Sequence, residues 1–391
     1  MPDMDDILNI PGLKVIGPRN KLPLELDVEL SSPITCPRCQ SNHHRKKCCL
    51  IRRIRHENFG KRSVYLWIKL WKYLCKRCFH FFRPPIPGVR KWQRATDAFK
   101  SQVCQTHQMG VSQKELADQW FLSCSTIERW FWHNLKRNDH AHQISRCPTY
   151  LGIDEHRFSH KVPFVTTLCD LGKHKILDVL PGRSQTDLHT ALLALPGRDH
   201  VKMVAMDLSE TYRQVVKTYF PNAQIVADRF HVIRLVNHAF MKTFKEFDPS
   251  IKSHRGKLRL LRTHSWNLST SKKQVLYTYL EKHPAIKALY LAKQELMTIL
   301  LARKSTAQQW KKLIQDFLHW KDQLKACPFP YLNTLGKTLE SWQEEIARMW
   351  RYSKNNGITE GFHRKMKLIQ RRAYGFRNFE NYRLRVKVLC G

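Results

Sequence analysis

Residues 149–154, with the sequence TYLGID, set the fold of the largest part of this chain, because they form a short apolar stretch that ends in an acid. Two later stretches repeat the pattern. VKMVAM at 201–206 is followed by Asp207, and AQIVA at 223–227 is followed by Asp228. Short apolar and β-branched runs predict buried strands. We therefore predict three strands that each end beside a carboxylate.

The sequence around these strands predicts a mixed sheet covered by helices. Stretches 163–169 and 175–180 predict two more strands with a hairpin turn at Asp170, and 186–195 and 210–219 predict helices. The resulting order is three strands, helix, strand, helix, strand, which is typical of an α/β domain. Residues 232–350 then have almost wholly helical character, with breaks at prolines.

Composition excludes several classes of protein. The 391 residues are 42% hydrophobic, enough for two or three folded domains rather than a disordered chain. No apolar run approaches the ~20 residues of a membrane-spanning helix, and the N-terminus lacks the features of a signal peptide. The net charge of +36 indicates a polyanionic partner, with nucleic acid as the default. Residues 44–100 carry a net +15 and residues 351–391 a net +9.

Four of the twelve cysteines form two Cys-x-x-Cys pairs, whose thiolates suit a tetrahedral zinc ion in a zinc ribbon-like module over residues 33–83. A strand is predicted at 64–71 inside this module. The four residues are Cys36, Cys39, Cys75 and Cys78. Other ligands remain open because His43, His44, Cys48 and Cys49 lie between the pairs, and unligated thiols are the alternative to a metal site.

The prolines at 84–87 predict a linker, and residues 91–107 a helix. Residues 112–130 then match a helix-turn-helix, with Ala117 at the helix crossing. Phe121 stands where the turn usually has glycine, so an ordinary helical hairpin is the alternative. We expect a recognition helix at about 125–135, with Arg129 and Lys136 as DNA contacts.

Three acids could carry chemistry, because buried carboxylates are costly unless they are paired or bind a cation. Asp154, Asp207 and the helix residue Glu360 could hold two Mg²⁺ ions about 4 Å apart for phosphodiester chemistry. Their structural alternatives are a turn acid for Asp154, a helix cap for Asp207 and a helix-dipole acid for Glu360. Asp228 is a rival ligand, and Glu155 could replace Asp154.

The C-terminal part adds cations beside this predicted centre. Thr359 is expected to cap the helix that carries Glu360. Arg364 and Lys367 share the helical face of Glu360, where a DNA backbone would run.

Together these motifs resemble the bacterial insertion-sequence transposases of the IS-L-three family. The resemblance runs from about Cys36 to the C-terminus. Its most specific segments are Asp228-Arg-Phe-His and Asn355-Asn-Gly with Glu360-Gly. It implies a ribonuclease-H-like catalytic core, with Asp154, Asp207 and Glu360 as an Asp-Asp-Glu triad and Asp228 outside it.

The resemblance also implies an all-α insertion at about 235–350, inside a catalytic domain at 148–391. An N-terminal segment (1–32), the zinc module (33–83) and the helix-turn-helix domain (90–140) precede it. We expect a cytoplasmic, nucleoid-associated bacterial transposase that uses Mg²⁺ (or Mn²⁺) and Zn²⁺, binds double-stranded transposon ends and target DNA, and forms at least a homodimer on DNA. The alternatives are a non-catalytic DNA-binding regulator and a structure-selective nuclease.

Overall fold

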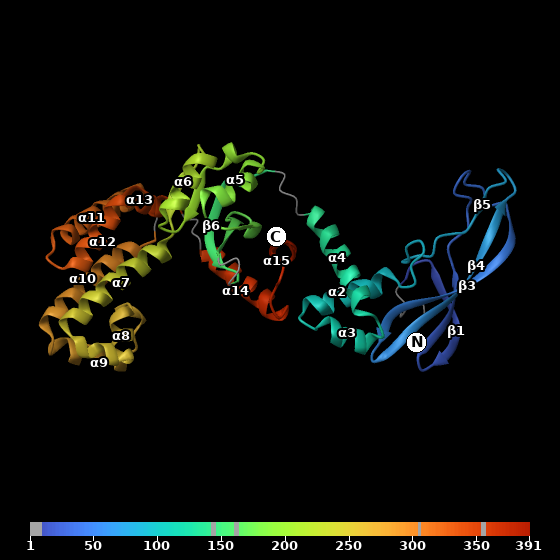
Figure 1. Ribbon diagram of the computed structural model, residues 1–391, viewed down its shortest axis with the longest axis horizontal. Coiled ribbons are helices and arrows are strands. Elements are labelled where there is room, and N and C mark those ends of the chain that lie inside the picture. The colour runs from blue at the N-terminus through green and yellow to red at the C-terminus, as the bar shows by residue number, and fades with distance from the viewer. Residues whose placement is uncertain (1–9, 142–145, 160–163, 304–305, 353–356) are drawn as a thin grey trace. The chain divides into compact units, whose positions relative to one another are not determined.

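The computed structural model describes residues 10–141, 146–159, 164–303, 306–352 and 357–391. It divides into two compact units, coloured blue to teal and green to red in Figure 1. The first unit comprises residues 1–140 with 372–375, and the second comprises 141–371 with 376–391.

A five-stranded sheet forms most of the first unit. Its strand order is β1-β2-β4-β3, with β5 paired to β4. Strands β3 and β4 form a long antiparallel hairpin, and Gly60 supplies the positive φ that its tight loop requires. The strands are β1 (Leu13–Lys21), β2 (Leu24–Leu30), β3 (His44–Phe59), β4 (Arg62–Cys75) and β5 (Phe81–Phe82).

The sheet crosses the boundary predicted at residues 32/33. Strand β2 pairs in parallel with β4, so the N-terminal segment and the predicted zinc module share one sheet. Their common core contains Leu26, Ile54 and Leu66. Ile86, from the predicted linker, is buried in the same core, so the prolines around it shape a packed segment rather than a free connection.

Three helices follow in the first unit: α2 (Asp97–Gln108), α3 (Gln113–Trp120) and α4 (Cys124–Ala141). Helix α2 begins six residues later than predicted because Thr96 caps it. The residues before the cap instead form backbone hydrogen bonds with β3. The Arg55 carbonyl accepts from the Thr96 N–H, and the Arg55 N–H donates to the Arg94 carbonyl. Phe121 adopts the left-handed conformation (φ 54°) that glycine usually supplies at this turn.

The second unit is built on a sheet with the order β10-β9-β6-β7-β8. Strands β6, β7 and β8 form an antiparallel meander, whereas β9 and β10 run parallel to β6. This confirms the predicted mixed α/β character. The strands are β6 (Tyr150–Arg157), β7 (Phe164–Asp170), β8 (Lys175–Pro181), β9 (Met203–Met206) and β10 (Gln224–Ala227).

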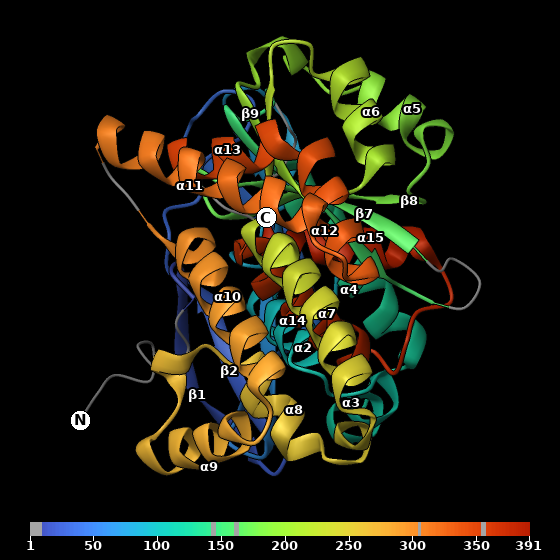
Figure 2. The ribbon, with the colours of Figure 1, turned by 90° about the vertical axis from the view of Figure 1, so that its left-hand side faces the viewer.

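Helices cover this sheet and extend it into a helical bundle. α5 (Gln185–Leu193) and α6 (Glu210–Tyr219) are the helices between strands. The bundle contains α7 (Arg229–Phe247), α8 (Arg255–Arg262), α9 (Thr270–Glu281), α10 (Pro284–Leu301), α11 (Ala307–Ala326), α12 (Pro330–Ser341) and α13 (Gln343–Arg351). In Figure 2, α7 and α10 run side by side, and α13 returns to pack on β10. Within the described residues, every helix is too short or too polar to cross a membrane.

The chain ends with α14 (Gly357–Arg372) and α15 (Phe379–Cys390). Helix α15 packs on β8, where Arg383 forms a two-pronged ion pair with the buried Asp178. Thr359 lies inside α14 and is fully buried, so its prediction as the cap is wrong. The predicted turn residues 355 and 356 fall outside the described residues.

Candidate active site

Three acids meet at one edge of the second sheet. Strands β6 and β9 pair in parallel with Gly152 opposite Ala205, which sets Asp154 level with Asp207. Strand β10 pairs with β9 through Ala227 and Met206, which sets Asp228 beside Asp207. The carboxyl ends of parallel strands are the usual position for a binding site in such sheets.

Asp154 is a buried acid inside a strand. Strand β6 continues to Arg157 because β7 pairs along its full length, so the expectation that Asp154 ends a strand is wrong. Only 9% of the residue is exposed. Burial raises the pKa of its carboxyl to about 7, and the charges of Asp207 and Asp228 act in the same direction. A cation is the partner that would remove this penalty.

Asp207 has an unsatisfied oxygen. Burial also raises the pKa of its carboxyl, and its Oδ1 has no hydrogen-bond partner among the described residues. The alternative role as cap of α6 is not observed, because the Ser209 hydroxyl accepts the Tyr212 N–H there. A buried carboxylate oxygen without a donor fits a bound cation.

Asp228 differs from its neighbour because both its oxygens have protein partners. Its Oδ1 accepts from the Phe230 N–H at 3.2 Å and caps α7. Its Oδ2 lies 3.3 Å from Nδ1 of His231. Burial opposes a charge on His231, but the nearby Asp228 carboxylate outweighs burial and raises the histidine pKa. Asp228 therefore caps α7 with one oxygen and forms an ion pair with the other.

His363 brings helix α14 to the acids, and sequence reasoning missed it. Its Nδ1 lies 3.7 Å from Oδ2 of Asp154, and its Nε2 lies 3.2 Å from the Thr167 hydroxyl on β7. Burial lowers the pKa of His363 to about 3, so the ring is neutral. The ring of His156 lies 5.0 Å away. The spacing of three residues from Glu360 was the available signal, because such residues share a helical face.

Glu360 lies in the first turn of α14, one turn before His363. Its side chain is half exposed and pairs with Arg364 at 2.9 Å. In the described part of the chain, the four cysteines are the only group of three or more potential ligands within 4.8 Å of one another. The structure therefore places Asp154 and Asp207 at matching positions beside paired strands, but the described residues include no group within this distance that joins them with Glu360.

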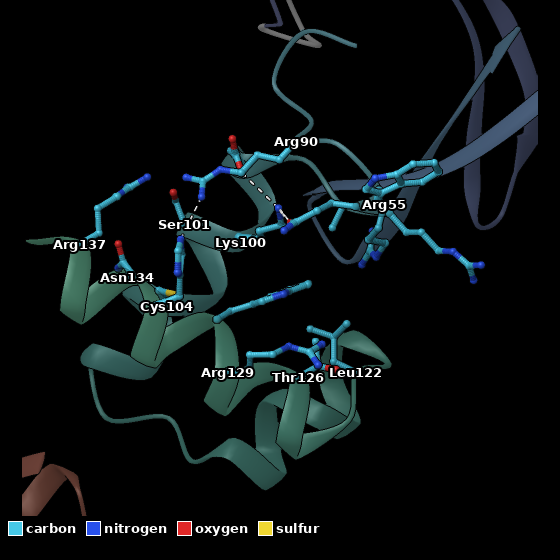
Figure 3. Close-up of a pocket in the computed structure, with 17 residues that line it drawn as sticks. Arg55, Arg90, Lys100, Ser101, Cys104, Leu122, Thr126, Arg129, Asn134 and Arg137 are labelled. Carbon is cyan, nitrogen blue, oxygen red and sulfur yellow. Dashed lines mark hydrogen bonds and ion pairs between the residues drawn. The ribbon is translucent and has the colours of Figure 1, made fainter. Parts of the chain in front are cut away.

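The predicted DNA contacts are exposed on two helices. Arg129 and Lys136 lie on α4, where Arg129 also lines a cleft of about 700 Å³ (Figure 3). Arg364 and Lys367 lie on α14. The Lys367 charge lowers the pKa of both buried histidines, His156 and His363, so this cation lies near the acids.

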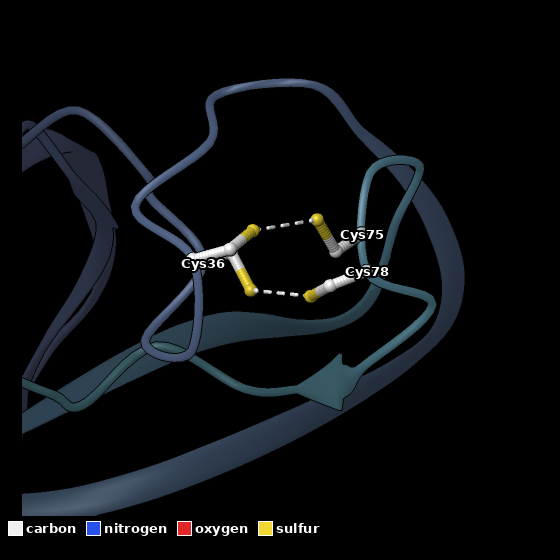
Figure 4. Close-up of side chains that lie close together, drawn as sticks. Cys36, Cys75 and Cys78 are labelled. Carbon is white, nitrogen blue, oxygen red and sulfur yellow. Dashed lines mark hydrogen bonds between the residues drawn. The ribbon is translucent and has the colours of Figure 1, made fainter.

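The four predicted cysteines converge in the first unit (Figure 4). Their sulfur atoms all lie within 4.8 Å of one another, with Cys36 3.5 Å from Cys78 and Cys39 3.5 Å from Cys75. Cys48 and Cys49 are exposed outside this group, and His44 instead contacts the Ile34 carbonyl. Four sulfurs at this separation fit a tetrahedral zinc ion.

Two matching backbone turns hold these cysteines. The Gln40 N–H donates to the Cys36 carbonyl, and the Phe79 N–H donates to the Cys75 carbonyl. Both donors have φ 57°, so Phe79 adopts the geometry that glycine would give. Hydrogen bonds from the Cys78 and Arg77 N–H groups lower the pKa of Cys75 to about 6 despite its burial. They favour the thiolate that a metal requires.

Comparison with known proteins identifies the family of this chain. Residues 151–386 match a family described as Transposase, of the IS-L-three type. The chain is 24% identical over 372 residues to a transposase for insertion sequence element IS1001 of Bordetella parapertussis, covering 90% of this chain and 87% of that protein. A protein of Lactococcus lactis named as an ATP-dependent protease is 26% identical over 139 residues, 33% of this chain and 44% of its own length. Because the family match covers more than half of its residues, this chain belongs to the IS-L-three family of insertion-sequence transposases.

Proposed function

We propose that the chain cleaves and joins DNA strands at a divalent-metal centre held by Asp154, Asp207 and Glu360. The observation that carries this proposal is the pair of buried acids on β6 and β9, one with a raised pKa and the other with an unpartnered oxygen. When bound there, Mg²⁺ (or Mn²⁺) would activate the attacking water or 3′-hydroxyl and stabilise the leaving oxygen.

The surrounding residues support the same reaction. The strand order of the second sheet supports the ribonuclease-H-like core that the resemblance implies, with helices α7 to α13 as its insertion. The side chain of His363 extends from α14 to Asp154, so the helix that carries Glu360 packs beside the acids. Arg364 and Lys367 follow on that helix, and their charges suit the phosphates of the strand being cut.

The first unit would bind the ends of the element. Its four cysteines would hold Zn²⁺ at the end of the β3–β4 hairpin opposite its Gly60 loop, where β3 begins and β4 ends. Helix α4 would contact DNA through Arg129 and Lys136. Phosphate contacts would supply affinity, and contacts to base edges would select the sequence. Two element ends must be joined in one complex, so we infer that at least two copies of the chain act together.

The test is Mg²⁺-dependent cleavage of DNA that carries the element's own ends, by the full chain. Asp207→Asn should bind this DNA normally but lose cleavage by roughly 10³-fold or more, because a metal ligand contributes several kcal/mol to the barrier. Asp228→Asn is the matched control: it lies at the same sheet edge, and an asparagine can still cap α7. It should cleave within a few-fold of the wild type.

Two results would contradict the proposal. One is an Asp207→Asn or Glu360→Gln variant that cleaves at the wild-type rate. The other is binding without metal-dependent cleavage by the wild type, which would favour a DNA-binding regulator.

A further inference from the structure

We propose that the cleft between residues 90–95 and helix α4 binds a short unpaired stretch of one DNA strand, with Trp92 stacked on a base. The inference deepens the DNA binding proposed above and rests on it. It assigns a ligand to a cavity that neither the zinc site nor the carboxylate site uses.

The cleft lies wholly within the first unit. Residues 90–95 form one wall, α2 contributes Lys100 and Ser101, and α4 forms the other wall with residues such as Arg129 and Arg137. Figure 3 shows these side chains around one space. Its volume of about 700 Å³ is within the range of clefts that hold ligands, roughly 300–1,000 Å³.

The charge of the lining suits phosphates. Six cationic side chains line the cleft against one carboxylate, Asp97, which already pairs with Arg90 and Lys100. Arg94, Arg129 and Arg137 are exposed, and none of them forms an ion pair with a described residue. Like charges gathered without counterions favour a bound polyanion.

Trp92 supplies a stacking surface at the edge of this space. Its side chain is 85% exposed, and Lys91 lies 5.6 Å from its ring. It occupies the third position of a turn that the Gln93 N–H closes on the Arg90 carbonyl. Its φ is 65°, a conformation that this turn position normally reserves for glycine or asparagine. A bulky residue in a strained, exposed position is a candidate for function.

The form of the cleft favours a single strand over a duplex. A major groove about 12 Å wide is filled by one helix of about 10–12 Å diameter. Residues 90–95 lie across the cleft from the α4 side chains Thr126, Arg129 and Asn134, so Arg129 would contact the strand held there. Lys136 lies outside the cleft lining and stays exposed to a duplex. One strand between the two walls would contact the arginines through its phosphates and Trp92 through a base.

The test compares two labelled DNA probes of the same sequence, a blunt duplex and the duplex with a short single-stranded tail. The full-length wild type should bind the tailed probe more tightly. Trp92→Gly should weaken binding of the tailed probe by about 10- to 100-fold, as expected for a lost base stack, and leave the blunt duplex unchanged. Arg94→Glu should act in the same direction, and Trp92→Phe should restore part of the preference.

The controls separate this result from misfolding. Glycine adopts a positive φ without strain, so Trp92→Gly should not lower the melting temperature. Phe121→Gly removes another exposed aromatic from the same backbone conformation outside the cleft, and should keep the tail preference.

Equal weakening of both probes by Trp92→Gly, or no effect on either, would overturn the inference while leaving the proposed function intact. Failure of the wild type to bind either probe would instead overturn the proposed function.

Discussion

The four-cysteine centre and the carboxylate centre are built in different ways. Each cysteine pair lies within four residues of chain, and one backbone turn orients both of its sulfurs. The acids are separated by 53 residues between Asp154 and Asp207 and by 153 between Asp207 and Glu360, so a sheet and a separate helix must position them. In the described residues the four sulfurs of the first centre lie within 4.8 Å of one another, whereas the three proposed ligands of the second do not form such a group.

This difference matches the structural role expected of a zinc centre and the catalytic role proposed for the acids. The four converged thiols fit a single metal ion, and the end of the sheet around them has a small core of its own with Tyr73 and Phe82. Such a centre stabilises the fold. The proposed carboxylate centre, with two buried acids on a sheet and its third ligand on a separate helix, would leave room for substrate oxygens, as catalytic metal sites do.

The largest expected effect is loss of the cysteine centre. Cys75→Ala should abolish binding of one zinc equivalent and unfold this end of the first sheet, since structural zinc contributes roughly 10 kcal/mol in small modules. Zinc released to a chromophoric chelator and limited proteolysis of the full chain measure both results.

Cys48→Ala is the control for this experiment, because Cys48 is exposed and lies outside the group. Equal zinc loss in both variants would show that the ligand set extends beyond the two Cys-x-x-Cys pairs.

Smaller changes in stability should distinguish an ion-paired buried acid of the second unit, Asp178, from the proposed metal ligand Asp154. Asp178→Asn should lower the free energy of unfolding by about 3 kcal/mol, because it breaks the pair with Arg383. Asp154→Asn should instead raise it by about 1 kcal/mol in EDTA, because it removes a buried carboxyl whose pKa is unfavourably raised. Urea unfolding monitored by circular dichroism measures both.

Addition of Mg²⁺ sharpens the same comparison. The wild type should become more stable as the ion binds, whereas Asp154→Asn should not. An Asp154→Asn variant that is as destabilised as Asp178→Asn would mean that Asp154 has a structural partner rather than a cation.

The sequence predicted which helices and strands exist better than the residues at which they begin and end. Helix α6 begins and ends as predicted, at residues 210 and 219, because an apolar face and a polar cap coincide there. The end of β6 was placed at Asp154, three residues early, because an acid usually marks a strand end and the pairing with β7 is not visible in one sequence. Residues 91–96 were assigned to a helix because only their tertiary contact with β3 reveals their path.

The site was predictable to the same extent. The adjacency of Asp154 and Asp207 follows from two apolar strands that each precede an acid. Asp207 and Asp228 differ in their partners: Ser209 caps α6 in place of Asp207, whereas Asp228 pairs with His231. These are side-chain contacts, which the periodicity of a sequence does not report. His363 lies in contact with Asp154 only because α14 returns to β6 and β7 after about two hundred residues.

The last expected effect is on catalysis rather than stability, and it tests whether the α14 residue His363 belongs to the carboxylate centre. His363→Ala should reduce cleavage by roughly 10- to 100-fold, which is the usual cost of losing a group that orients a metal ligand, and leave DNA binding unchanged. The Mg²⁺ concentration for half-maximal cleavage should rise, because Asp154 loses a neighbour that holds its carboxyl in place. Because the ring is neutral, His363→Gln should restore part of the activity that His363→Ala loses, by a hydrogen bond alone.

His189→Ala is the control, because His189 is a histidine of the same unit that hydrogen-bonds Tyr219 on α6 rather than an acid. An unchanged Mg²⁺ requirement in His363→Ala would place α14, and Glu360 with it, outside the metal centre.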